Sequence, residues 1–366
     1  WKLGAVARAL IPRLALPADE PRIGGMLPPG RAGALVNLAL AMAGRTAVNL
    51  NHTAGPVQVE RMCTIAGVRT VISSKQYLRR IGDPALPGRV LHAEDLLPGL
   101  STLTVLFHAL RHLLLPARWL QGSAPDAVAA VVFSSGSTGD PKGVELTHRQ
   151  ILANCTAIAD GLHVIGGQDV LLNPLPLFHS FGLVPGTWLG LTQGISTANH
   201  PDPNDAKAIG DLFQAVKATF LISTPTFVRG YLRRIEPAQF ASMRFAVVGA
   251  ERCPAELRAQ FRERYQADLL EGYGCTELGP VVTISLPTVE HGGEREVRQR
   301  DGSVGRPLPG IMVRAIDPET RAELPPGRDG LLVVLSPARM RGYLGRDDLT
   351  AKALVGEGYS TGDIGK

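Results

Sequence analysis

The N-terminal part of the chain alternates short apolar runs with longer amphipathic segments. The short segments at residues 23–27, 46–50 and 69–73 each contain adjacent apolar residues and predict β-strands. Between them, residues 34–43 and 56–66 repeat apolar side chains at helical spacing, which predicts two helices. A β-α-β-α-β order is typical of a parallel sheet, so an α/β fold is expected.

The same alternation continues through the middle of the chain. Further strands are predicted at 127–133, 169–173, 219–223, 245–248 and 268–271, and further helices at 148–159, 183–191, 206–216 and 254–265. Three of these strands lead into small or polar residues, at Thr224, Gly249 and Tyr273. Because the carboxyl ends of parallel strands line one crevice in which ligands bind, we expect a binding site there.

From about Gly302 onward the pattern changes to short strands between turns, which predicts antiparallel pairing in a small barrel-like module. The whole chain is therefore expected to be α/β, with two parallel-rich α/β subdomains and a small distorted β-barrel. The predicted boundaries are 1–295 for the paired subdomains, 296–358 for the barrel and 359–366 for the start of a hinge region.

Two segments, 1–16 and 103–120, mix apolar and basic residues at helical spacing. The second carries too many charges and is too short to span a membrane. Each segment has two interpretations, a helix packed on the protein or a helix lying on a membrane surface. For both segments we favour packing, and peripheral membrane contact remains the alternative.

Composition limits the possible partners. The net charge is +5 and the pI is about 9.2, but the arginines are spread along the chain rather than gathered in a stripe with aromatic residues. Nucleic acid is therefore not an expected partner. Anionic small molecules, an acidic carrier protein or an anionic membrane surface suit this charge.

The cysteines indicate a reducing compartment. They are far apart and form no CxxC pair, so neither a zinc site nor a disulfide framework is predicted. No signal peptide is recognisable and the chain starts at Trp1, so we expect a cytoplasmic segment of a longer polypeptide. Attachment to the inner membrane, if any, would use 1–16, 103–120 or regions outside the chain.

One stretch carries a chemical signature of its own. Hydroxyl and glycine residues follow the predicted strand at 127–133 and lead to Pro141, Lys142 and Gly143; they are Ser134, Ser135, Gly136, Ser137, Thr138 and Gly139. Glycines allow backbone N–H groups to turn toward an anion, while hydroxyls and a lysine add donors and charge. A solvated turn is the alternative, but the combination favours phosphate binding. It is not a Walker A loop, because Gly143 follows the lysine where that motif needs Ser or Thr.

Two later motifs complete a recognisable set. Residues 272–277 read Gly-Tyr-Gly-Cys-Thr-Glu and residues 359–363 read Tyr-Ser-Thr-Gly-Asp. Together with 134–143 they resemble the adenylate-forming (AMP-binding) superfamily of acyl-CoA synthetases over nearly the whole chain. Residues 173–182 are most similar to the fatty acyl branch, in particular to the acyl-[acyl-carrier-protein] synthetase half of bifunctional acyltransferases that reacylate lysophosphatidylethanolamine.

The resemblance implies ATP and Mg²⁺ as cofactors and a two-step ligase reaction. A fatty acid would form an acyl-adenylate, and a thiol of acyl-carrier protein or CoA would then take the acyl group. Lys142 and residues 134–139, which we call the hydroxyl loop, would hold the β- and γ-phosphates. Glu277, with Thr138 nearby, would bind the metal, and Asp363 would bind the ribose. As plain loop or turn acids, Glu277 and Asp363 would have no such role.

The resemblance also assigns residues around the base and the acid. Those expected to contact the nucleotide are Gly249, Ala250, Glu251, Tyr273, Gly274 and Thr276. His179 corresponds to the family's aromatic position beside the acyl carboxylate; alternatively it is a packed core histidine. Two other functions remain open, namely adenylation of an aryl or amino acid and a non-catalytic module that binds adenylate or fatty acid.

One departure from the family concerns the C-terminal end. Members of the family continue into a small mobile domain that carries a lysine used in adenylation, and Lys366 lies in the wrong context for that lysine. We therefore expect the chain alone to bind ATP or acyl-adenylate but to turn over slowly.

Overall fold

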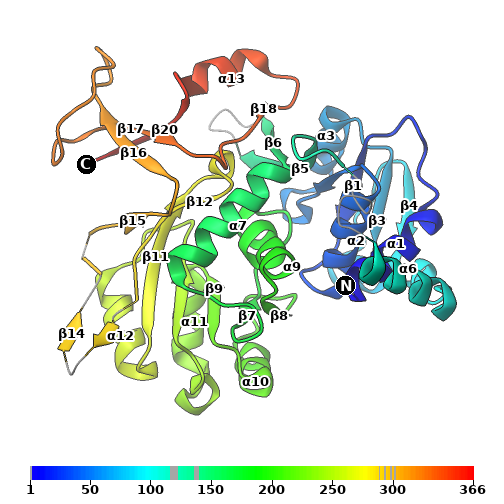
Figure 1. Ribbon diagram of the computed structural model, residues 1–366, viewed down its shortest axis with the longest axis horizontal. Coiled ribbons are helices and arrows are strands. Elements are labelled where there is room, and N and C mark those ends of the chain that lie inside the picture. Colours follow the sequence, from blue (N-terminus) through cyan, green and yellow to red (C-terminus); the bar gives the residue numbers. More distant parts are fainter. Residues whose placement is uncertain are drawn as a thin grey trace. The chain divides into compact units, whose positions relative to one another are not determined.

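The computed structural model describes residues 2–115, 123–135, 140–287, 289–291, 294–296, 299–300 and 302–366. They form two compact units (Figure 1). The first comprises Trp1–Arg149, Leu177–His179 and Arg341–Arg346; the second comprises Gln150–Pro176, Ser180–Met340 and Asp347–Lys366.

The first unit is built on a seven-stranded sheet of order β18-β6-β5-β2-β1-β3-β4. Its strands are β1 (Arg22–Met26), β2 (Thr46–Asn49), β3 (Thr70–Ser73), β4 (Arg89–His92), β5 (Val128–Ser135), β6 (Pro141–Thr147) and β18 (Gly342–Tyr343). The strands from β4 to β5 run parallel, as the β-α-β pattern predicts, and β6 and β18 continue the sheet antiparallel.

Helices cover both faces of this sheet. They are α1 (Lys2–Leu14), α2 (Arg31–Met42), the short η1 (His52–Ala54), α3 (Pro56–Ala66), α4 (Lys75–Arg80), α5 (Ala93–Leu96) and α6 (Thr102–Leu114). Ile23 and Ile72 belong to a core with α1 and α2, while Val48 and Val71 belong to a second core with α3. Because successive strand residues point to opposite faces, the apolar side chains of these strands fill both cores.

The second unit contains a sheet of order β15-β12-β11-β10-β9-β7-β8. Its strands are β7 (Val170–Asn173), β8 (Ser196–Asn199), β9 (Phe220–Ser223), β10 (Phe245–Val248), β11 (Asp268–Gly274), β12 (Val281–Ile284) and β15 (Arg306–Pro307). The run from β8 to β11 is parallel, β12 pairs antiparallel with β11, and β15 pairs antiparallel with β12.

The helices of this unit alternate with its strands. They are α7 (His148–Leu162), α8 (Ser180–Leu183), η3 (Val184–Trp188), α9 (Leu189–Gln193), α10 (Ala206–Val216), α11 (Pro225–Arg234), η4 (Pro237–Phe240), α12 (Ala255–Tyr265) and η5 (Thr276–Leu278). Phe213 of α10 and Phe261 of α12 are fully buried in one core with Leu221 of β9 and Leu269 of β11. This core fixes the strands whose carboxyl ends carry the candidate site.

The remaining antiparallel strands confirm the change of pattern after Gly302. β16 (Met312–Ile316), β17 (Gly330–Leu335), β20 (Gly358–Gly365) and β19 (Leu354–Val355) form a four-stranded sheet in that order, followed in Figure 1 from orange to red. The helix α13 (Asp347–Ala353) precedes β19, and β13 (Val289–His291) pairs with β14 (Glu294–Glu296).

Three local predictions need correction. The segment 103–120 is helical only as far as Leu114, and residues 116–122 lie outside the described ones. The helix predicted at 183–191 consists of α8, a π-helical turn at Val184–Trp188 and α9, because Pro185 cannot donate a regular helical hydrogen bond. Residues 141–147, which follow the hydroxyl loop, form a strand that the sequence reading did not predict.

Candidate active site

The hydroxyl loop connects two antiparallel strands of the first unit. β5 and β6 pair from Val128 opposite Thr147 to Ser135 opposite Pro141, and this register places Ser134 opposite Lys142. Gly136, Ser137, Thr138 and Gly139 lie outside the described residues, as does the side chain of Ser135. The described flanks therefore bring the first hydroxyl and the lysine of the motif side by side.

The lysine of this hairpin lies over an aromatic ring. The Nζ atom of Lys142 is 5.6 Å from the centre of the Tyr343 ring, and Tyr343 belongs to β18, which pairs with β6. Next to the lysine, a Cβ at Gly143 would lie 3.1 Å from Val131 and 3.3 Å from Leu344. The glycine thus lets β6 pack closely, and this packing sets the position from which the Lys142 side chain starts.

His179, the candidate neighbour of the acyl carboxylate, also lies in the first unit. Its ring is 4.7 Å from that of Phe178, which in turn is 5.2 Å from the ring of His52. The residue is exposed, but the protein atoms around its ring desolvate it, and this desolvation lowers the pKa of His179. The imidazole is therefore neutral at pH 7, so it can donate or accept one hydrogen bond without adding charge.

The second unit joins two motifs that are 90 residues apart in the chain. The hydroxyl of Tyr273, near the end of β11, donates a hydrogen bond of 2.6 Å to Oδ2 of Asp363 in β20. Burial, followed by the bond to this carboxylate, raises the pKa of Tyr273, so the phenol stays protonated as the donor. Asp363 is exposed, which leaves its carboxylate accessible to a ligand.

Thr276 and Glu277 lie in the short helix η5, directly after β11. The Thr276 Oγ1 atom is 3.1 Å from Oγ of Ser180, the first residue of α8. Glu277 is buried, and its backbone carbonyl accepts a hydrogen bond of 2.7 Å from the Met340 N–H. Burial and the adjacent Glu277 carboxylate raise the pKa of Cys275 well above its usual value, so this thiol stays protonated.

The turn after β10 contains Gly249, Ala250 and Glu251. Ala250 has a φ of +67°, in the left-handed region that L-residues seldom adopt, at a typical cost of about 1 kcal/mol. Glu251 accepts a hydrogen bond of 2.6 Å from Thr226 Oγ1, at the start of α11. A Cβ at Gly249 would meet Gly272 and Phe181 only at ordinary contact distances of 3.4 and 3.6 Å. Packing within the protein therefore does not require this glycine.

At Gly274, unlike Gly249, packing within the protein does require glycine. A Cβ there would lie 1.9 Å from the carbonyl oxygen of Pro280, where β11 turns into β12. The close approach of these two backbones requires a residue without a side chain. This packing role accounts for Gly274 whether or not it also contacts a nucleotide.

Sequence reasoning missed two residues of this region, Ser180 and Phe181. Ser180 contacts Thr276, and Phe181 is the side chain next to Gly249. Their signal was their place after the Pro-Leu-Phe-His run, but a contact with the end of β11 depends on tertiary structure.

Upstream, the buried Asn173 side chain fixes the Pro-Leu-Phe-His run. Its amide nitrogen donates hydrogen bonds to Gly186 O and Asn199 Oδ1, and its amide oxygen accepts one from the Leu175 N–H.

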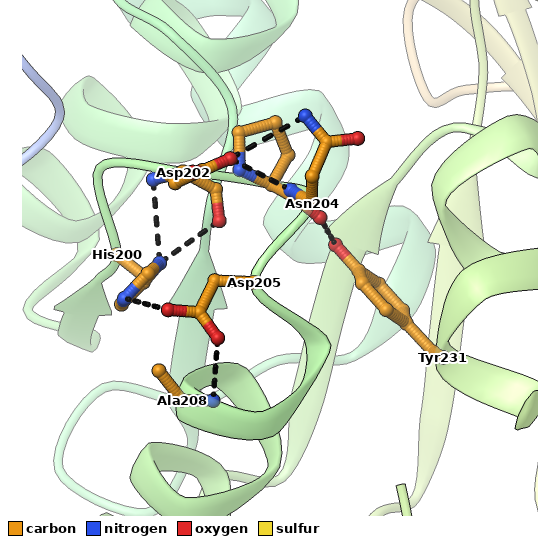
Figure 2. A network of polar contacts seen from close by, with 7 residues as sticks. His200, Asp202, Asn204, Asp205, Ala208 and Tyr231 are labelled. Carbon is orange, nitrogen blue, oxygen red and sulfur yellow. Dashed lines mark hydrogen bonds and ion pairs between the residues drawn. The ribbon is translucent and has the colours of Figure 1, made fainter. Parts of the chain in front are cut away.

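A second polar cluster follows β8, and its residues form hydrogen bonds and an ion pair with one another (Figure 2). His200 Nε2 lies 3.9 Å from Asp205 Oδ2, and the other oxygen of Asp205 accepts the Ala208 N–H at the start of α10. The Tyr231 hydroxyl donates to the Pro203 carbonyl at 2.9 Å. These contacts hold the loop and cap the helix, so we assign the cluster a structural role.

Comparison with known proteins establishes the family. The sequence profile described as AMP-binding enzyme matches residues 2–344. The chain therefore belongs to the AMP-binding enzyme family, in agreement with the resemblance of its three motifs.

Among curated relatives, the chain is similar to ligases. It is 28% identical to 4-coumarate–CoA ligase of Pinus taeda over 340 residues, which are 90% of this chain and 62% of the relative. It is 32% identical to 4-coumarate–CoA ligase 2 of Narcissus pseudonarcissus over 252 residues, or 67% of this chain and 43% of the relative. The chain thus spans less than two thirds of the length of these relatives.

Solved structures share the fold. ATP-bound MatB from Rhodopseudomonas palustris superposes with a TM-score of 0.80 at 25% identity, covering 100% of this chain and 70% of that one. The N-terminal domain of FACL13 from Mycobacterium tuberculosis gives a TM-score of 0.79 at 20% identity, covering 100% of this chain and 88% of that domain. These likenesses confirm the predicted α/β architecture with its small antiparallel sheet.

Proposed function

We propose that this chain carries the adenylation site of an AMP-forming acid–thiol ligase. An oxygen of the substrate carboxylate attacks the α-phosphorus of ATP, the bond to the β-phosphate breaks, and pyrophosphate leaves. A thiol then attacks the acyl carbon and releases AMP. The observation that carries this proposal is the bond between Tyr273 and Asp363, which joins two motifs beside the buried Glu277 at the end of β11.

The residues support distinct roles in the first step. A mobile ammonium group at Lys142 suits the negative charge that moves onto pyrophosphate, and the Ser134–Gly139 motif supplies N–H and hydroxyl donors for the same group. The exposed Asp363 carboxylate can accept hydrogen bonds from ribose hydroxyls. The half-buried Tyr273 ring, fixed through its hydroxyl, suits stacking against a base.

The donor set also fits Mg²⁺ brought by the nucleotide. Within the described part of the chain, no group of three or more His, Cys, Asp or Glu side chains could hold a metal by itself. Mg²⁺ usually takes one or two carboxylates together with phosphate oxygens and water. Glu277 would supply that carboxylate, with Thr138 as a second candidate ligand, and the metal would neutralise phosphate charge.

The acid is proposed to be a plain carboxylic acid. A site for an amino acid needs an acidic group to hold the substrate amine, and residues 178–182 contain none. The similarity of 173–182 to the fatty acyl branch supports a long-chain fatty acid. The names of the curated relatives instead support an aryl acid such as 4-coumarate. The acceptor would be CoA, as those names suggest, or acyl-carrier protein.

The test separates binding from turnover. The 366-residue chain is titrated calorimetrically with non-hydrolysable acyl-adenylate analogues carrying palmitoyl, octanoyl, 4-coumaroyl, benzoyl and acetyl groups. ATP–pyrophosphate exchange is then measured with the same acids and with amino acids. We expect tight binding of one long-chain or aryl analogue and exchange with the matching acid.

The two readouts distinguish the possible failures. Tight binding without exchange, both in this chain and in a version extended by the C-terminal domain of a relative, would favour a non-catalytic adenylate-binding module. Failure to bind any of the analogues would contradict the proposed site. Exchange with amino acids alone would contradict the proposed substrate class.

A further inference from the structure

The helix α6 exposes its apolar side. Six large apolar side chains recur along it at intervals of three or four residues and are 48–78% exposed, namely Leu103, Leu106, Phe107, Leu110, Leu113 and Leu114. We call these six residues the outer stripe. A surface helix of a globular protein normally turns such a stripe toward the core. Scattered exposed leucines are ordinary, whereas a continuous stripe of six marks an interaction site.

The opposite side of α6 holds the helix on the protein. α6 lies beside α1 (Figure 1), and Ala109 is its buried residue. A Cβ at Gly4 of α1 would come within 3.0 Å of His112 Nε2, so the two helices approach closely at this glycine. The Nδ1 atom of His112 lies 2.7 Å from the His108 carbonyl oxygen. Small and polar residues thus face the protein while leucines face outward.

The charge around the outer stripe is positive. The helices α1 and α6 contain Lys2, Arg8, Arg13 and Arg111 and no Asp or Glu. The Arg111 guanidinium lies 5.8 Å from the centre of the Phe107 ring, at the margin of the stripe. Burial, and then the nearby charge of Arg111, lower the pKa of Arg8, so these two guanidinium groups lie close enough to repel each other.

The acids nearest to α6 in sequence, Asp95 and Glu94, are engaged elsewhere. Asp95 of α5 forms an ion pair of 2.7 Å with Lys75, and Glu94 accepts hydrogen bonds from Ser74 and from the N–H groups of Lys75 and Gln76. Arg13 itself binds the carbonyl oxygens of Leu96 and Gly99, which carry no net charge. These two acids therefore do not neutralise Arg111 of α6.

We propose that the outer stripe docks α6 onto an anionic lipid surface, with the helix lying in the plane of the interface. A helix of 13 residues is about 20 Å long, and an apolar face with basic margins is the pattern of an interfacial helix. In the described residues no helix is long and apolar enough to cross a membrane. A two-fold dimer through the same face would bring like charges together, which disfavours a second copy as the occupant.

Vesicle flotation tests this proposal directly and independently of the proposed chemistry. The chain is mixed with vesicles of pure phosphatidylcholine or with vesicles in which about 30% of the phosphatidylcholine is replaced by anionic phosphatidylglycerol. Both are used at low and at high salt. We expect it to float with the anionic vesicles at low salt and to bind less at high salt. Equal binding to both vesicle types, or no binding to the anionic ones, would overturn the proposal.

A matched pair of substitutions tests the stripe itself. Leu110 and Leu152 are both helical and both 48% exposed, but Leu152 lies on α7, away from the stripe in sequence. Leu110→Gln should weaken partitioning by about tenfold, whereas Leu152→Gln should leave it unchanged. Equal effects of the two would contradict docking through α6. Circular dichroism shows whether each variant is folded, and each leucine is exposed enough to tolerate the change.

A charge variant distinguishes docking on anionic lipid from non-specific hydrophobic binding. Arg111→Gln should weaken binding to the anionic vesicles about fivefold and have little effect with phosphatidylcholine. No change with the anionic vesicles would contradict the electrostatic part of the proposal. A stable dimer in size-exclusion chromatography that Leu110→Gln dissociates would identify a second copy as the occupant and overturn lipid docking.

Discussion

The two seven-stranded sheets follow one plan. In each, a parallel run ends at a strand, β5 or β11, whose next neighbour returns antiparallel as β6 or β12. We call the passage from the parallel run to this antiparallel strand the return. In both sheets a chemical motif lies at the return. The first carries Ser134–Lys142 and the second carries Tyr273–Glu277. Ligands of α/β proteins bind beyond the carboxyl ends of parallel strands, so each sheet places its motif where binding is expected.

The difference between the two returns lies in how the motif is held. At the end of β11, Tyr273 binds Asp363, Thr276 contacts Ser180, and Gly274 lets the backbone of Pro280 approach. At the end of β5, the described contact of the Lys142 amino group is the face of the Tyr343 ring. The second motif is thus part of the packed structure, whereas the described contact of Lys142 is with a ring that carries no net charge.

The largest expected effect is on Lys142, and it should fall on chemistry rather than on folding. Lys142→Ala removes the charge proposed to stabilise leaving pyrophosphate, so ATP–pyrophosphate exchange should fall by about 10²- to 10³-fold. The contact with Tyr343 contributes only about 0.5–1 kcal/mol, so urea unfolding should change by no more than that. A control, Lys352→Ala on α13, should leave exchange unchanged. Unaltered exchange in Lys142→Ala would remove this lysine from the mechanism.

The next effect contrasts two glycines of the second unit. Gly274→Ala places a Cβ 1.9 Å from the Pro280 carbonyl oxygen, so we expect it to cost about 2–3 kcal/mol in the free energy of unfolding. Gly249→Ala makes only ordinary contacts of 3.4 Å and longer, so its stability should change by less than about 0.5 kcal/mol. Nucleotide binding should nevertheless weaken in Gly249→Ala if a base approaches that backbone. Equal losses of stability in the two variants would contradict this distinction.

Much of the fold follows from local pattern, and the contacts within the site do not. The segments 46–50, 69–73 and 245–248 predicted their strands because short stretches built around adjacent apolar residues suit strands that are buried on both faces. β6 was missed because Pro141 and Gly143 suppress strand propensity, and its pairing with β5 overrides them.

The motifs identified Tyr273 and Asp363 separately. Their hydrogen bond depends on how the four-stranded sheet brings β20 to the end of β11, and no local signal encodes that contact. The same holds for Ser180 and Thr276. The left-handed conformation of Ala250 was also not predictable, because alanine carries no preference for positive φ.

The smallest effect tests whether the second motif is tied to β20 by a real energetic coupling. Tyr273→Phe keeps the ring but removes the donor to Asp363, so the free energy of unfolding should fall by about 1 kcal/mol. A double-mutant cycle with Asp363→Ala isolates the pair, and a coupling energy of about 1 kcal/mol is expected from urea unfolding. Because the contact is partly exposed, a value much larger than this is not expected. A coupling energy near zero would mean that Tyr273 and Asp363 meet without stabilising each other. The two returns would then differ in geometry but not in how firmly the protein holds them.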